Sequence, residues 1–386
     1  MAVAVGVIVA NIYYIQPLLS AIAGTFGLTV TRAGTLAMLS QAGTALGMLF
    51  FVPLGDKYER RSLILVLMAG ALFALGFMAL APNVLCLALA AFLLGAFAAC
   101  VHVVVPFAAH LAAPAQRGRV VGTVVAGILM GVLLARTFSG TLGAWLGWRA
   151  VYGLAAGAML VLAAVLRLQL PISQPETAIS WRELMTSTLA LVRRHPRLRE
   201  SALLGALLFA GFSAFWTTLV FFLAEPPYAV ASPSAAAGLF GLVGALGALA
   251  APGIGHLAGH HGPRFTIRIS LWLTFLSFLL MGFVGKNLAG LIVSVILMDL
   301  GVQGGHVSNQ TRIYGIDPAA RSRLNTVYMF CYFIGGGLGS LCGALAWHRA
   351  GWWGVCGVGS GALLLALAVE FLHGRAEKRL PMAGAR

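Results

Sequence analysis

The sequence has few charged residues and very few acidic ones. Of its 386 residues only 9% are charged and only 10 are Asp or Glu, whereas 60% are apolar. Soluble domains carry about 25% charged residues. So few charges cannot cover a surface that faces water, and the composition therefore excludes an ordinary soluble protein. We expect lipid to surround most of the chain.

Motifs of metal, redox and catalytic sites are also lacking. The five cysteines lie inside apolar segments and none forms a CxxC pair, which argues against a zinc site or a disulfide framework. The sequence contains neither the G-x-x-x-x-G-K-[ST] motif that binds ATP phosphates nor the HExxH or Ser/His/Asp patterns of hydrolases. We therefore expect no cofactor, no metal and no enzymatic activity.

The net charge of +15 indicates membrane topology rather than a nucleic-acid partner. Nucleic-acid-binding proteins cluster their basic residues on one face that is exposed to water. Here the Lys and Arg residues fill short gaps between apolar segments, and most of these gaps lie on the same side of the predicted membrane. By the positive-inside rule, both termini are expected in the cytoplasm.

Twelve apolar segments are long enough to cross a bilayer, which takes about 20 helical residues each. They lie near residues 2–22, 34–53, 62–80, 84–106, 119–143, 148–168, 200–223, 235–255, 265–283, 287–311, 323–345 and 351–372. Most connections between them are short, so consecutive helices are antiparallel. The predicted fold class is therefore an all-α membrane protein with twelve transmembrane helices.

The most hydrophilic segment, residues 169–199, divides these spans six from six. Within it, Trp181–Val192 has the amphipathic pattern of a short helix at a membrane surface. We therefore expect an N-terminal six-helix bundle over 1–168, a cytoplasmic linker over 169–199, and a C-terminal six-helix bundle with a short basic tail over 200–386.

The two bundles repeat one another. At one constant offset, His102 corresponds to His306 and Gly147–Trp148 corresponds to Gly351–Trp352. Because His and Trp are uncommon in this chain, the matches indicate a duplicated unit in parallel orientation, with chance alignment of similar helices as the alternative. Two related bundles can rock about a central site and open it to either side of the membrane. The repeat therefore favours a transporter.

A loop between the second and third spans carries a family signature. The segment PLGDKYERRSLI resembles the signature GxLaDRxGRR of the major facilitator superfamily, with matches at Asp56, Lys57, Arg60 and Arg61. In that family the loop latches the two halves in the outward-facing state, so the resemblance implies a gating loop made by these four residues. Asp56 is also placed to cap the third span or to pair with a neighbouring Arg. A loop that merely obeys the positive-inside rule is the alternative.

Two further segments extend the resemblance along the chain. Ala10–Leu19 and Asp299–Asn325 resemble parts of bacterial inner-membrane sugar and nucleoside efflux permeases, which belong to the twelve-span drug/proton antiporter-like group. The resemblance implies secondary active efflux but does not fix the substrate. We expect a monomeric, proton-coupled exporter of a small organic solute, sugar-, nucleoside- or drug-like, in a bacterial inner membrane. An importer or uniporter of the same fold, or a membrane receptor or regulator that transports nothing, are the alternatives.

Ionisable residues inside a membrane are costly, so each is a functional candidate. Asp299 is the only carboxylate near the centre of a span, and Arg136 is the only basic residue at depth. A pair between the two is favoured, with Arg136 extending to the outer interface as the alternative. His102 and His306 change charge in the physiological pH range, unless they are neutral and bonded to backbone or Gln. These four residues are the candidates for proton coupling.

Polar and aromatic side chains on five spans mark the expected solute cavity. Asp299, Gln303, His306 and Gln310 share one face of the tenth span, either as a cavity lining or as a hydrogen-bonded scaffold. The remaining cavity candidates are Asn11, Tyr14, Gln16, Gln41, Trp216, Asn325, Tyr328 and Tyr332. Neutral polar groups beside aromatic rings suit an uncharged hydroxylated or heterocyclic solute.

Overall fold

The computed structural model describes residues 1–113, 116–173, 181–249, 262–317 and 320–379, without the side chains of Asp56, 245–249 and 375–379. The described residues form helices and contain no β-strand, so the all-helical prediction is confirmed. They include ten helical stretches that are long and apolar enough to cross a membrane.

The described residues of the N-terminal half form nine helices. They are α1 (Ala2–Tyr13), α2 (Ile15–Phe26), α3 (Val30–Phe50), α4 (Leu54–Lys57), α5 (Arg60–Ala79), α6 (Val84–Ala98), α7 (Val101–Leu111), α8 (Arg117–Leu146) and α9 (Trp148–Gln169). The helix pairs α1–α2 and α6–α7 each make one membrane-length stretch. The break at Tyr14 has a local cause, because Pro17 has no N–H to bond the carbonyl of Tyr13.

The C-terminal half follows a short helix in the connection between the halves. That helix is α10 (Trp181–Arg194), which lies at the position of the expected amphipathic helix. After it come α11 (Pro196–Ala224), α12 (Pro233–Leu249), α14 (Pro263–Val284), α15 (Leu288–Tyr314) and α16 (Arg321–Arg379). The longest of these, α16, leaves helical geometry at Ala350 and Gly351 and therefore consists of two arms.

Two turns between helices support the repeat. Gly147 separates α8 from α9 with a φ of 82°, and Gly351 separates the two arms of α16 with a φ of 55°. Positive φ values favour glycine, because a side chain would clash with the backbone there. Each glycine precedes a Trp whose indole N–H donates a hydrogen bond, to Thr25 Oγ1 at 3.0 Å or to Met281 O at 2.9 Å. The two halves thus use the same local device to reverse the chain.

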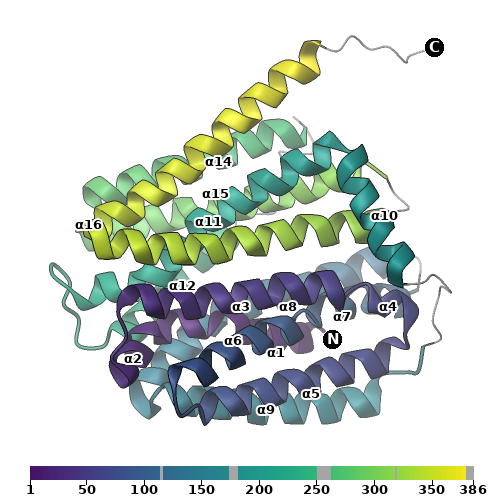
Figure 1. Ribbon diagram of the computed structural model, residues 1–386, viewed down its shortest axis with the longest axis horizontal. Helices are drawn as coiled ribbons and strands as arrows, with labels where there is room; N and C mark the ends of the chain where they lie inside the picture. Colours follow the sequence, from purple (N-terminus) through teal and green to yellow (C-terminus); the bar gives the residue numbers. More distant parts are fainter. Residues whose placement is uncertain (114–115, 174–180, 250–261, 318–319, 380–386) are drawn as a thin grey trace.

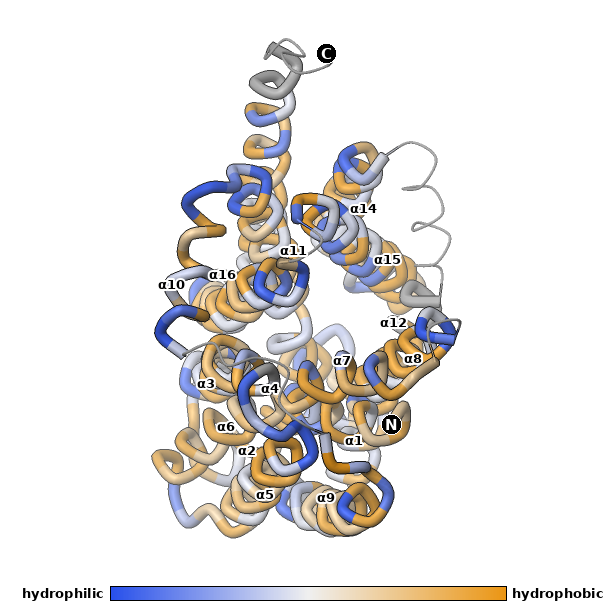
Figure 2. Tube along the Cα trace, turned by 90° about the vertical axis from the view of Figure 1, so that its right-hand side faces the viewer, coloured by the Kyte–Doolittle hydropathy of each residue, from blue (hydrophilic) through white to orange (hydrophobic). Residues whose placement is uncertain are grey.

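The helices gather into two groups that follow the two halves of the chain (Figures 1 and 2). Helices α1–α9 form one group, and α11, α14, α15 and α16 form the other, while α10 crosses beside both at one end (Figure 1). The ring of Trp181 at the start of α10 stacks on Phe50 of α3, with 6.0 Å between their centroids. Figure 2 shows apolar residues on the outer sides of both groups, as lipid contact requires.

The two halves touch through α3 with α16 and through α8 with α12. At the first contact, a Cβ on Gly34 would clash with Cβ of Ala344. At the second, Thr137 Oγ1 donates a hydrogen bond to the carbonyl of Gly238 at 2.9 Å. The chain crosses the bundle once, through α1 and α2, before it reaches Gly34 in the first turns of α3. The halves therefore meet at the end of the bundle opposite the chain termini.

Candidate functional site

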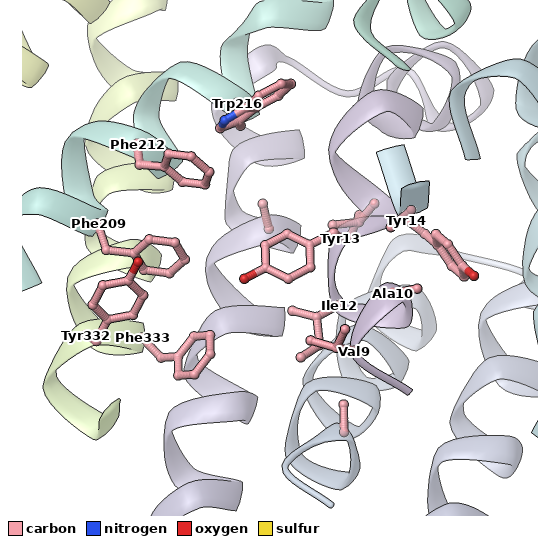
Figure 3. Packing of buried hydrophobic residues seen from close by; sticks show 14 of the residues in the cluster. Val9, Ala10, Ile12, Tyr13, Tyr14, Phe209, Phe212, Trp216, Tyr332 and Phe333 are labelled. Atoms are coloured by element: carbon pink, nitrogen blue, oxygen red, sulfur yellow. The ribbon is translucent and has the colours of Figure 1, made fainter. Parts of the chain in front are cut away.

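Arg136 lies on α8 in the middle of the bundle, and only 1% of it is exposed. Its Nε donates a hydrogen bond to Gln16 Oε1 at 2.9 Å. Its guanidinium carbon lies 4.0 Å from the ring centroid of Trp216, 5.3 Å from that of Phe212 and 5.0 Å from that of Tyr13. Figure 3 shows Tyr13 extending from the first half toward the aromatic side chains of the second. Side chains of both halves therefore fix the orientation of Arg136.

Helix α12 presents glycines to two charged side chains. A Cβ on Gly241 would lie 3.0 Å from Cβ of Arg136, and a Cβ on Gly244 would lie 2.9 Å from Oδ2 of Asp299. The two glycines are three residues apart, so Arg136 and Asp299 lie roughly one helical turn apart along α12. Because Gly241 and Gly244 have no side chains, both charged groups can approach α12 closely.

Arg136 and Asp299, called the central charges below, do not form the direct ion pair that the sequence favours. Asp299 is 2% exposed. The two charges are close enough to interact through space, but among the described atoms no nitrogen of Arg136 lies within 4 Å of a carboxylate oxygen of Asp299. In the described part of the chain, Nη2 of Arg136 and Oδ2 of Asp299 both lack a hydrogen-bond partner. Each central charge therefore keeps one bonding position open.

His306 joins α15 to the inner arm of α16. Its Nδ1 lies 3.1 Å from Oη of Tyr328, and its ring centroid lies 4.8 Å from that of Tyr332. The ring of Tyr332 stacks on Phe209 of α11 at 4.0 Å, and Figure 3 shows these two rings side by side. His306 remains partly exposed. These contacts bring three of the expected cavity residues together.

Near the C-terminal end of α15, its polar face makes a second cluster of polar side chains. Nε2 of Gln310 donates a hydrogen bond to Oδ1 of Asn325 at 3.2 Å, and the same oxygen accepts one from the hydroxyl of Tyr314 at 3.0 Å. Gln303, Gln310 and Asn325 are partly exposed, whereas Asp299 is buried. The polar face of α15 therefore contacts α16 at His306 and Gln310, and its exposure decreases toward Asp299.

His102 comes from the other half of the molecule. It is the second residue of α7, which follows a short interruption after α6. His102 is partly exposed and close enough to His306 for the charges of the two rings to interact. Among the residues that the structure describes, no three His, Cys, Asp or Glu side chains gather as metal ligands. The two imidazoles are thus a pair contributed by the two halves.

Tyr13, rather than the expected Tyr14, faces the second half. Adjacent helical residues point about 100° apart, and Figure 3 shows the Tyr14 side chain pointing away from the rings of α11. The Tyr14 ring instead lies 6.0 Å from that of Phe138. The side chain of Asn11 bonds to the backbone of its own helix. Its Nδ2 donates hydrogen bonds to the carbonyls of Val7 at 3.1 Å and Ile8 at 3.3 Å. These positions correct the expected cavity lining of the first span.

Gln41 lies at the contact between the halves instead of in a cavity. It is 3% exposed on α3, and a Cβ on Gly337 of α16 would lie 3.6 Å from its Cβ. Within the described residues its Oε1 has no hydrogen-bond donor. Gln41 is therefore buried by the closure of the two halves.

The loop before α5 is organised by Glu59, which the sequence pattern did not single out. Asp56 is expected to cap this helix or to pair with an Arg, but its side chain lies outside the described residues. The side chain that caps α5 is that of Glu59. Its carboxylate accepts hydrogen bonds from the backbone N–H groups of Arg61 at 2.8 Å, Ser62 at 2.7 Å and Ser173 at 3.0 Å. Although partial burial opposes ionisation, these hydrogen bonds and one from the Ser62 side chain lower the pKa of Glu59 to about 2.

The basic residues of the same loop bind within the first half. Nε of Arg60 donates to the carbonyl of Gly55 at 3.0 Å, and Nη2 of Arg61 donates to the carbonyl of Arg167 at 2.6 Å. Lys57 is exposed, with its Nζ 5.5 Å from the ring centroid of Tyr58. In this state the described side chains of the loop are thus anchored to their own half.

A second group of charges lies at the end of the C-terminal half near the chain terminus, and its two carboxylates are buried. We call it the C-half charge cluster, and it consists of Glu200, Arg264, Arg268, Arg312 and Glu370. Nη2 of Arg312 lies 2.7 Å from Glu200, and Nη2 of Arg268 lies 2.8 Å from Glu370. Arg264 bridges the two carboxylates at 3.1 and 3.2 Å. The cluster ties α11, α14, α15 and α16 together.

An apolar groove of about 490 Å³ lies between α1, α8 and α9, and Tyr14 is one of its lining residues. Val3, Met130 and Leu154 line it, and each is about half exposed or more. Such a lining matches lipid tails instead of a polar solute. The groove is therefore part of the membrane-facing surface.

Comparisons with known proteins agree with this architecture. The sequence pattern of the Major Facilitator Superfamily matches residues 1–249. The chain is 42% identical to the uncharacterized transporter YgaY of Escherichia coli O157:H7, over 96% of this chain and 93% of that protein. It is 26% identical to the Helicobacter pylori protein named "Probable sugar efflux transporter", over 91% and 88% of the two chains.

The fold is also shared with a solved transporter structure. The crystal structure of the nucleoside transporter NupG superposes with a TM-score of 0.79, at 14% identity, over 96% of this chain and 99% of that one. The match at this identity establishes the fold alone. The family pattern and the identity to a full-length transporter go further, and this chain belongs to the Major Facilitator Superfamily of membrane transporters.

Proposed function

We propose that this protein is a proton-coupled exporter of a small organic solute. The observation that carries the proposal is the pair of central charges, one from each half, buried beside the contact between the halves with bonding positions open. A buried charge without a partner costs several kcal/mol, so a purely structural role would not retain two of them. Charges that gain and lose partners during a transport cycle explain their retention.

The proposal includes twelve spans with cytoplasmic termini in a bacterial inner membrane. The two arms of α16 count as two spans, and the shorter apolar helix α12 supplies another. Loops rich in Lys and Arg lie at the end of the bundle that carries the termini, which favours the cytoplasm for that end. Reporter fusions in the loops that contain Lys57, Arg182 and Arg264 check this, and an external signal from any of them would overturn the topology.

Alternating access follows from where the halves touch. Their contacts lie opposite the termini, so the state described is closed on that side, and cytoplasmic termini make it inward-facing. Rocking of the C-terminal half would carry α12 and α15 away from α8 and open the outer side. The loop Asp56–Arg61 lies at the opposite end, where we assign it the gating role in the other state.

Asp299 is the proposed proton carrier. Near Arg136 its negative charge is compensated, whereas separation of the halves removes this compensation and favours protonation. His306 and His102 come from different halves and lie close enough to interact electrostatically, and we assign them the relay of the proton. Gln303, Gln310, Asn325, Tyr328 and Tyr332 are the proposed solute-contacting residues on the way to Asp299.

A metabolite-export screen tests the proposal. Cells that produce the wild-type protein, Asp299→Asn or no protein are compared for solutes in the medium, and each hit is added to inverted membrane vesicles with an internal pH dye. We expect a solute that is exported by the wild type alone and that moves protons out of acidified vesicles. Arg149→Gln is the control, because Arg149 also stacks on a Trp, at 4.2 Å, but is exposed. Solute uptake into right-side-out vesicles would identify an importer instead.

A further inference from the structure

The central charges have open bonding positions of opposite sign. Nη2 of Arg136 is a donor without an acceptor, and Oδ2 of Asp299 is an acceptor without a donor, among the described residues. Oppositely charged groups this close normally pair, because pairing compensates both for their loss of water. Their separation therefore needs a cause.

Each central charge is held in place by other contacts. Gln16 fixes Nε of Arg136, and the rings of Trp216 and Tyr13 hold its guanidinium group. The carboxylate of Asp299 lies directly against the backbone of Gly244. The two groups are thus held apart by their other contacts, one belonging to each half of the molecule.

The surroundings of the Arg136 guanidinium group are aromatic. Tyr13 comes from the first half, and Phe212 and Trp216 come from the second, all three within 5.3 Å of the guanidinium carbon. The indole N–H of Trp216 has no acceptor among the described residues and is a further donor. An anionic group with an apolar body nearby would match this donor set.

We infer that the transported solute is a small zwitterion with an apolar body. Its anionic group binds Nη2 of Arg136 and the indole N–H of Trp216, and its ammonium group binds Oδ2 of Asp299. This inference rests on the proposed transport function and replaces the uncharged solute that the sequence suggests. The contact between the halves covers both atoms in the present state, so the site opens when α12 and α15 move away from α8.

The site also gives a reason for exchange of solute against protons. Oδ2 of Asp299 holds either a proton or the ammonium group of the solute, since one oxygen cannot serve both. Binding of a proton at this oxygen therefore releases the solute, and binding of the solute releases the proton. Mutual exclusion of this kind is what an antiporter requires.

Three sets of four compounds test the charge requirement on the purified full-length protein in lipid nanodiscs. Each set holds a zwitterion, its amide as a cation, the deaminated acid as an anion and the deaminated amide as a neutral compound, built on phenylalanine, leucine or glycine. Binding is followed by the shift in unfolding temperature. In at least one set we expect the zwitterion to act at about tenfold lower concentration than its three analogues, because each charged hydrogen bond contributes about one decade of affinity or more.

Two variants assign the ends of the solute. Arg136→Gln should remove the advantage of the zwitterion over the cation, and Asp299→Asn should remove its advantage over the anion. Arg149→Gln should leave the order unchanged. If either variant fails to fold, Arg136→Lys or Asp299→Glu replaces it, and the moved charge should reduce the corresponding advantage. Zwitterions that bind no better than the neutral compounds in every set, or not at all, would overturn the inference.

The transport proposal fails on a different result. A neutral solute from the export screen that drives proton movement in the wild type would remove the zwitterion site and leave proton-coupled transport standing. No solute-linked proton movement with any exported compound would remove the transport proposal itself.

Discussion

The C-half charge cluster and the central charges are built in opposite ways. In the cluster each carboxylate is buried and binds two guanidinium groups at distances between 2.7 and 3.2 Å, while Arg268 remains exposed. At the centre, Arg136 and Asp299 are both buried, yet they do not bind each other. The carboxylates of the cluster pair with arginines of the same half, whereas the central charges are divided between the halves.

The largest effect on stability is expected from breaking the cluster. Glu370→Gln removes the carboxylate that Arg264 and the exposed Arg268 share, and because both arginines still reach water we expect a loss of about 3 kcal/mol, the low end for a buried ion pair. Thermal unfolding of the purified protein measures this loss. Glu225→Gln is the control, because Glu225 is an exposed residue beyond the end of α11. Equal unfolding temperatures for the two variants would show that the cluster does not stabilise the C-terminal half.

A smaller effect on stability, with a larger one on transport, is expected from moving a central charge. Gly244→Ala places a Cβ 2.9 Å from Oδ2 of Asp299, so the carboxylate must shift, at about 1–3 kcal/mol for overpacking. The matched control is Gly157→Ala on α9, where a Cβ would meet nothing within 4 Å. Solute-linked proton movement should fall in the first variant only. Normal transport by Gly244→Ala would mean that the position of Asp299 is not critical.

The smallest effect is expected at Glu59, a carboxylate satisfied by backbone N–H groups. Glu59→Ala removes the cap of α5 and should cost about 1 kcal/mol. The pKa of Glu59 in the folded protein, about 2, lies below its usual value of 4.5, so ionisation stabilises the fold above pH 4.5. This contribution is lost as the pH falls from 4.5 through 2. Unfolding measured across that range should show the wild type approaching the variant, and a constant difference would contradict the capping role.

Much of the fold was predictable because helical periodicity and apolar length are local properties. The amphipathic helix α10, the polar face of α15 and the paired turns at Gly147 and Gly351 all depend on residues that are near one another in sequence. The closeness of Arg136 and Asp299 was predictable for another reason, since few charges are available at depth to compensate each other.

The remaining features depend on distant segments. Glu370 meets Arg264 and Arg268 across about a hundred residues, so no local pattern predicts the C-half charge cluster. The choice of Tyr13 over Tyr14 depends on the rotation of α1 against its neighbours, which the sequence of the helix alone leaves open. The contact of Asp299 with Gly244 depends on how α12 packs against α15, which no local pattern predicts.

Transport by Asp299→Asn in proteoliposomes tests the central claim most directly. Proteoliposomes that contain the variant are assayed in two ways. Vesicles loaded with the exported solute measure exchange of labelled against unlabelled solute. Vesicles under a pH gradient measure proton-driven accumulation of the solute. Asparagine keeps the volume of the side chain but cannot carry a proton, so we expect exchange to continue and proton-driven accumulation to disappear. Accumulation by Asp299→Asn at the wild-type level, with the wild-type pH dependence, would contradict the account.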